Sequence, residues 1–339
     1  MKRHWRVGVT VSFFLFLNAD SVWAGLPQLF TSVRGSQPET APFTSWSGDV
    51  SSIFFTAAES GTPLQMRDLL KNGARIDERD SEGNTALILA AAANLNPEMI
   101  QILAEAKADV NVRNKNELNP MMAAAERNIN PAVIAELVKA GASLDEKGTS
   151  QTTPLLSSIF VNPNPAVVFE LIRLGADVNL ANKDGTTPLM AACFENHGPE
   201  VAEALLKAGA NVDAKNVLGS TALTFAVGMT NDLELIGLLI AAGANVNASN
   251  NRGQTALHYA MRGEDKSAIV ALLIESGANV NAEDENGATP LMLAARSDAD
   301  AKTVGLLREA GADFHAKDKE GRTALDIAKQ SKGETVLYE

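Results

Sequence analysis

The sequence predicts an all-α repeat fold, a solenoid of stacked helix-turn-helix units with hairpin-like loops between them. Two markers recur every 34 residues, and their phase never slips. The first marker is the series Thr85, Thr153, Thr187, Thr221, Thr255, Thr289 and Thr323, with Asn119 at the missing step. The second is the series Gly73, Gly141, Gly175, Gly209, Gly243, Gly277 and Gly311, with Lys107 at the missing step. We therefore expect about nine units from Ser51 to the end of the chain, including a degenerate first unit and a truncated last one.

The local chemistry of one unit explains why these residues recur. Thr187 is expected to cap the first helix by accepting from free backbone N–H groups, and Pro188 takes the first helical position, where its missing N–H costs nothing. Small apolar residues then follow at helical spacing, so that a neighbouring helix can approach closely. Gly209 is expected to end the second helix in the left-handed conformation.

Four successive units also carry a start signal for the second helix. These are Asn96-Pro97, Asn130-Pro131, Asn164-Pro165 and Gly198-Pro199, and Thr62-Pro63 lies one period earlier. One pair of short helices cannot bury its apolar face alone, so each unit must lean on its neighbours.

Two units depart from the pattern. Lys107 stands where a helix-ending glycine is expected, and Glu117 stands at the turn glycine of the third unit. A non-glycine residue in the left-handed region costs about 1 to 2 kcal/mol. We expect local opening to be easiest there.

The N-terminus predicts export. Basic residues precede a short apolar run, and Val22-Trp23-Ala24 resembles a cleavage site, so residues 1–24 are predicted to be a signal peptide and 25–50 a flexible lead-in to a repeat domain at 51–339. The alternative is an uncut signal anchor. After cleavage no span of the membrane is expected, and the product is expected in the periplasm or outside the cell.

The charge makes nucleic acid a poor partner. The formal net charge is −12, and loss of residues 1–24 makes it more negative by two. The same acidity also fits a protein that simply stays soluble. Cys193 is the single cysteine, so an intramolecular disulfide is excluded.

The residues do not suggest an enzyme. His197, His258 and His315 fall at three different repeat positions, so no metal site is expected, and no cofactor motif was found. Cys193 lies on the inner stripe of a first helix, which favours a small core residue over a nucleophile. The acidic cluster at 283–287 lacks the spacing of a calcium loop and is expected to be a solvated turn.

The pattern resembles the ankyrin repeat. It is carried by Asn-x-x-Gly-x-Thr-Pro-Leu-Met-x-Ala at 182–192, by Gly-Ala-Asn-Val-Asn at 243–247 and 277–281, and most closely by the Thr-Ala-Leu-His sequence that ends at His258. The resemblance is to exported bacterial ankyrin proteins, including periplasmic ones. The period of 34 exceeds the family's usual 33, and the extra residue is expected in the loop between the two helices.

The resemblance implies a protein partner met by the hairpin tips and the concave face of the first helices. Transferred by register, the partner-binding residues are Leu156, Phe160, Val161, Met190, Phe194, Val217, Leu218, Met229, Arg252 and Arg262. An apolar patch with charged flanks is typical of a docking surface. The alternative is that Phe160 and Phe194 fold inward and fill the space between helices.

The function predicted from the sequence is a non-catalytic interaction module or scaffold in the cell envelope, acting as a monomer. An accessory subunit that supports a periplasmic enzyme, for example in oxidative-stress defence, and a secreted effector remain alternatives. Fold-level analogy alone licenses only binding to a protein partner.

Overall fold

The computed structural model describes residues 50–195, 198–263, 266–297 and 299–331. The predicted signal peptide and almost all of the lead-in, together with His197, lie outside these residues. The first helix begins at Val50, one residue before the predicted start of the repeat domain. No helix in the described ranges is both long and apolar enough to cross a membrane.

Helix pairs follow one another along the described chain, and these residues contain 17 α-helices and no strand. The first helices of the repeats are α1 (Val50–Ser60), α3 (Ala86–Ala93), α5 (Pro120–Arg127), α7 (Pro154–Val161), α9 (Pro188–Glu195), α11 (Ala222–Met229), α13 (Ala256–Ala260), α15 (Pro290–Ser297) and α17 (Ala324–Ser331). The second helices are α2 (Pro63–Lys71), α4 (Glu98–Glu105), α6 (Pro131–Lys139), α8 (Pro165–Arg173), α10 (Pro199–Lys207), α12 (Leu233–Ala241), α14 (Ser267–Glu275) and α16 (Ala301–Glu309). A 3₁₀ turn, η1 (Thr149–Gln151), lies in the hairpin loop before α7. Eight pairs and the single α17 give the nine units that the sequence predicts.

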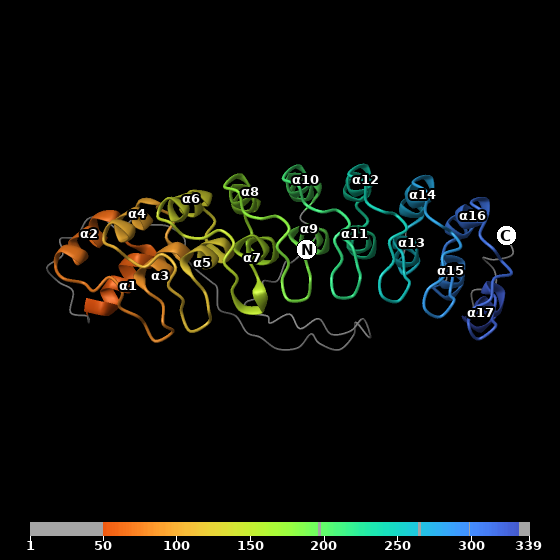
Figure 1. Ribbon diagram of the computed structural model, residues 1–339, viewed down its shortest axis with the longest axis horizontal. Coiled ribbons are helices and arrows are strands. Elements are labelled where there is room, and N and C mark those ends of the chain that lie inside the picture. The colour runs from red at the N-terminus through yellow and green to blue at the C-terminus, as the bar shows by residue number, and fades with distance from the viewer. Residues whose placement is uncertain (1–49, 196–197, 264–265, 298, 332–339) are drawn as a thin grey trace. The chain divides into compact units, whose positions relative to one another are not determined.

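The two kinds of helix form separate rows, which Figure 1 shows as odd-numbered and even-numbered labels. Each first helix packs against the first helices before and after it, and each second helix does the same within its own row. One apolar cluster continues through the repeats from Phe54 in α1 to Ala328 in α17. The first helices contribute many buried alanines to it, as the close approach of neighbouring helices requires.

The helix boundaries confirm the caps predicted at Thr187 and Gly209, whereas the Thr85 hydroxyl, at the start of α3, makes no capping hydrogen bond. The Thr187 hydroxyl accepts from the backbone N–H of Met190 at 3.3 Å, and Pro188 begins α9. Gly209 has φ 91°, and Lys107 and Glu117 adopt the same left-handed region with φ 69° and 62°. The two departures from the glycine pattern therefore keep the repeat geometry and bear its conformational cost.

Buried asparagines join successive repeats in the loops between first and second helices. The Asn128 amide donates to the carbonyl oxygens of Ala91 and Asn94 at 3.0 and 2.9 Å, both in the preceding repeat. Its own oxygen accepts from the backbone N–H of Asn130 at 2.9 Å. Asn94 and Asn162 make the equivalent bonds one repeat earlier and one repeat later.

Further along the chain, a buried lysine instead of an asparagine donates to the helix-end carbonyl oxygens of the preceding repeat. The Lys266 ammonium donates to the carbonyl oxygens of Val227 and Thr230, which end the first helix of the preceding repeat. Burial lowers the pKa of Lys266. A different residue type, placed two positions later in the register, thus satisfies the same kind of helix-end carbonyl.

Candidate protein-binding surface

The last turn of each first helix places one residue per repeat on a common row, which we call the helix-end row. Its members are Glu126, Phe160, Phe194, Gly228, Arg262, Arg296 and Gln330, each 34 residues after the one before. The row is acidic at its first member, aromatic at the next two and cationic at Arg262 and Arg296. It therefore presents different chemistry along the stack.

The two phenylalanines of the row are partly buried, and neither of the two sequence interpretations describes them fully. Phe160 packs against the core cluster and keeps part of its ring exposed. The Phe194 ring meets the Phe225 ring edge-on, with centroids 6.1 Å apart. Edge-on contact is a preferred geometry for aromatic pairs, and both rings are half-buried.

The surface continues from the aromatic rings to the cations through Tyr259. Its hydroxyl accepts from the Asn250 amide at 3.0 Å, and its ring lies under the Arg262 guanidinium at 4.9 Å from the ring centroid. A Cβ on Gly228 would lie 3.2 Å from the Tyr259 ring, so the glycine leaves room for the tyrosine. Phe225 and Tyr259 were not among the binding residues predicted from the sequence. Both precede a helix-end position by three residues, a helical spacing that marks them as neighbours on the same face.

Two predicted binding residues are in the core. Leu156 and Met190 are 0% and 1% exposed, so the expectation that they face the groove is wrong. They occupy the third position of their helices, and the equivalent residue His258 shows where that position points. His258 Nε2 lies 3.1 Å from the carbonyl oxygen of Ala288 in the next repeat. Side chains at this position are therefore covered by the following hairpin.

The hairpin tips hold exposed apolar residues on a fixed backbone. Val217 and Leu218 are 60% and 52% exposed. The backbone N–H of Val217 donates to the backbone carbonyl oxygen of Asp184 at 3.0 Å. The backbone carbonyl oxygen of Leu218 accepts from the backbone N–H of Asn251 at 2.9 Å. Because each tip is bonded to the tips on both sides, little backbone freedom remains to be lost on binding.

The other predicted residues are also accessible. Val161 and Met229 are 49% and 43% exposed and directly follow the helix-end positions of α7 and α11. Arg252 lies on the next tip, where its guanidinium is 3.7 Å from the Glu285 carboxylate. Eight of the ten predicted residues are thus at least partly exposed, and the structure arranges them as a helix-end group and a tip group.

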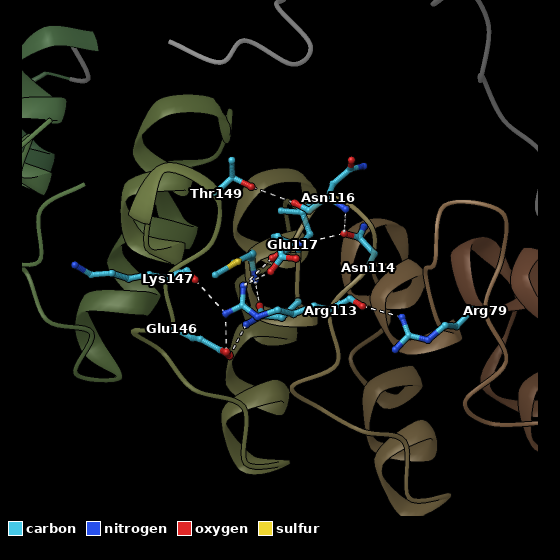
Figure 2. A network of polar contacts seen from close by, with 11 residues as sticks. Arg79, Arg113, Asn114, Asn116, Glu117, Glu146, Lys147 and Thr149 are labelled. Carbon is cyan, nitrogen blue, oxygen red and sulfur yellow. Dashed lines mark hydrogen bonds and ion pairs between the residues drawn. The ribbon is translucent and has the colours of Figure 1, made fainter. Parts of the chain in front are cut away.

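A cluster of charged residues in repeats two to four has a structural role (Figure 2). Arg113 donates to the Glu146 carboxylate at 2.6 Å and to the carbonyl oxygens of Glu117 and Lys147 at 2.9 and 3.0 Å. The carbonyl of Arg113 accepts from Arg79 at 2.8 Å. Arg113 therefore links three acceptors from two successive hairpins. These bonds stabilise the turn in which Glu117 adopts the left-handed conformation.

The described residues do not gather metal ligands, since no group of three or more His, Cys, Asp or Glu side chains among them could hold an ion. His258 is buried, which lowers its pKa. Asp284, predicted to lie in a solvated turn, is only 8% exposed and accepts from the backbone N–H groups of Asn286 and Ala288. That carboxylate therefore shapes its own turn.

Glu126, the acidic end of the row, supplies a test of how well the row is packed. Burial raises the pKa of Glu126, while Arg127 and the Ser157 hydroxyl oppose the shift. A carboxyl with a raised pKa costs stability when ionised, and the cost disappears as the pH falls through the folded pKa toward the unfolded value of about 4.3. We expect Glu126→Gln to raise the melting temperature at pH 7.5 and to lose this advantage near pH 4.

The control for this substitution is Glu275→Gln, which changes an exposed carboxyl at the end of α14. Thermal melts at pH 4 and 7.5 compare the two variants with the unchanged chain. A Glu126→Gln variant that is less stable at pH 7.5 would contradict the assignment of desolvation as the main effect.

The described residues form a stack of helix pairs with exposed hairpin tips and helix ends. A comparison with protein families matches ankyrin repeats in three copies, over residues 54–148, 155–250 and 228–318. The chain belongs to the ankyrin repeat family. Repeats of this family are in general protein-interaction modules. A search of curated proteins finds no match.

Proposed function

We propose that the chain is a non-catalytic scaffold of the cell envelope that binds a protein partner through its helix-end row and hairpin tips. One observation carries the proposal. The stack has exposed apolar side chains at the Val217 and Leu218 tip and partly exposed aromatic rings at Phe160 and Phe194. Aromatic and aliphatic side chains held in a fixed geometry supply most of the energy of a protein interface. The predicted signal peptide supports the envelope as the location.

The test is affinity capture from envelope extracts with the unchanged chain and with the double variant Phe160→Asp, Leu218→Asp. We expect a partner that the unchanged chain retains and the variant loses by at least about tenfold, since a buried carboxylate at an interface is costly. The matched control is Leu64→Asp, Phe169→Asp. It makes the same two changes at positions 67% and 38% exposed on the second helices α2 and α8.

Phe160 is partly buried, so its replacement could also weaken the fold. Melting curves check this, and the variant Val217→Asp, Leu218→Asp changes only exposed tip residues. The proposal fails if the folded tip variant and the unchanged chain retain the same proteins, or if the second-helix control loses the partner as well.

A further inference from the structure

Backbone hydrogen bonds join successive hairpin tips along the stack. The second residue of a tip donates its backbone N–H to the carbonyl oxygen of the third residue of the tip before it, as Lys183 does to Ser150 at 3.0 Å. The same bond joins Glu285 to Arg252 at 2.8 Å. It is absent between the tip before α5 (residues 114–117) and the tip before α7 (residues 148–151), the only such gap among the tips that the structure describes. We call these two the α5 tip and the α7 tip.

The two tips beside the gap also have unusual backbones. Glu117, Ser150 and Gln151 have φ of 62°, 59° and 58°, a left-handed conformation that is unfavourable for residues other than glycine. Gly148 stands at the first position of the α7 tip, where the other described tips have Asp or Asn. Those side chains accept from N–H groups of their own tip and shape it, which glycine cannot do.

A second series of bonds between repeats is weak at the same junction. It lies in the loop after each second helix, where the Ser143 N–H is 3.5 Å from the Asn111 side-chain oxygen, at the limit of a hydrogen bond. At the five later junctions the equivalent distances are 2.7–2.9 Å. The packing of α5 on α7 and the buried bonds of Asn162 remain, so the junction is weakened on its hairpin side.

Side chains join the α5 and α7 tips instead (Figure 2). Glu146 uses both carboxylate oxygens, accepting from Arg113 at 2.6 Å and from the Asn119 amide at 2.9 Å. The Thr149 hydroxyl donates to the carbonyl oxygen of Asn116 at 3.2 Å. Later repeats have a residue that cannot make the Glu146 contacts at the equivalent positions, which are Ala214, Ala248, Ala282 and Ala316. A carboxylate is therefore present where the backbone bond is absent.

We propose that this junction is a hinge at which the repeats from α1 to α6 open as one block, and that the Glu146 contacts hold the hinge closed. Each unit of a stack contacts only its neighbours, so a weakened interface divides the stack into blocks that open separately. Helix α7 carries Phe160 and Val161 and packs against α5. Opening therefore takes away a neighbour of the proposed binding surface, and Glu146 controls how often this happens.

The test is hydrogen–deuterium exchange of the full chain, followed by mass spectrometry of peptic peptides, with and without Glu146→Ala. We expect the amides of α2 to α6 to lose protection by a common factor of at least about tenfold, because hydrogen bonds to charged groups contribute strongly. The amides of α9 to α16 should exchange as in the unchanged chain. Thr149→Val, which removes only the bond to Asn116, should give the same pattern with a smaller factor.

The matched control is Glu285→Ala. It removes a carboxylate that lies 3.7 Å from Arg252 of the preceding tip, at a junction where the backbone bond between the tips is present. We expect no block of helices to lose protection in this variant. Separate opening of the repeats before it would mean that any ion pair between tips has this effect, and the special role of Glu146 would be lost.

Three results with Glu146→Ala would overturn the inference: no change in exchange, a change confined to the α5 and α7 tips, or an equal loss of protection in all helices. If Glu146→Ala unfolds the first block outright, circular dichroism shows a partial loss of helix, and Cys193 in α9 stays unreactive toward a thiol reagent. That outcome supports the hinge. Complete unfolding with rapid labelling of Cys193 would show that the stack opens as one unit.

Discussion

Replacing Asn128 with alanine is expected to lower the free energy of unfolding by about 3 kcal/mol. The side chain is 1% exposed and makes three hydrogen bonds, two of them to carbonyl oxygens of the preceding repeat. Alanine leaves these two oxygens and the Asn130 N–H without partners, and each such group costs about 1–3 kcal/mol unless water reaches it. Urea unfolding followed by circular dichroism measures the loss.

The matched substitution is Asn116→Ala, at an exposed position of a hairpin tip. A surface change of this kind usually stays within about 0.5 kcal/mol. Equal effects of the two substitutions would mean that the bonds of Asn128 between repeats are replaced by water at little cost.

The asparagines of these loops also show which features could be predicted from the sequence and which could not. The dipeptide Asn130-Pro131 correctly predicts the start of α6, and the Asn130 side chain accepts from the Ala132 N–H at 3.0 Å. The role of Asn128 was not foreseen, because its partners are backbone carbonyls. Every residue has a backbone carbonyl, so the sequence does not show which carbonyl oxygen a side chain will bind.

The binding surface was predicted unevenly for a related reason. The 34-residue register placed Phe160, Phe194, Val217 and Leu218 at positions that are at least partly exposed. It misplaced Leu156 and Met190, because register fixes where a residue lies on its own helix but not which part of the next repeat covers it. The hairpin of the next repeat, seen in the contact between His258 and Ala288, decides that exposure.

The contacts of the acidic residues near Arg262 and Arg296 could not be predicted from the sequence either. Glu283, Asp284 and Glu285 lie in the next hairpin and could each serve as a partner on sequence grounds. In the fold Asp284 turns to its own backbone and Glu285 lies near Arg252. Charge composition therefore predicts an acidic surface, but it does not predict which group each carboxylate contacts.

The second large effect concerns Cys193, whose thiol is expected to react with a disulfide reagent at least about a thousandfold more slowly in the folded chain than in the unfolded one at pH 8. Burial raises the pKa of this thiol to about 12, and its side chain is 0% exposed within α9. Only the thiolate attacks, so the raised pKa and the closed packing act in the same direction. Release of a chromophore from Ellman's reagent, with and without urea, gives the two rates.

An exposed thiol supplies the reference for this rate. Ser81→Cys in a Cys193→Ala background places the thiol on a hairpin tip and should react at nearly the unfolded rate in the folded chain. Since α9 packs between α7 and α11, slow labelling of Cys193 reports separation of these helices. Fast labelling in a chain that remains helical would mean that the thiol is reachable in the folded state, and the nucleophile interpretation of Cys193 would then replace the core interpretation.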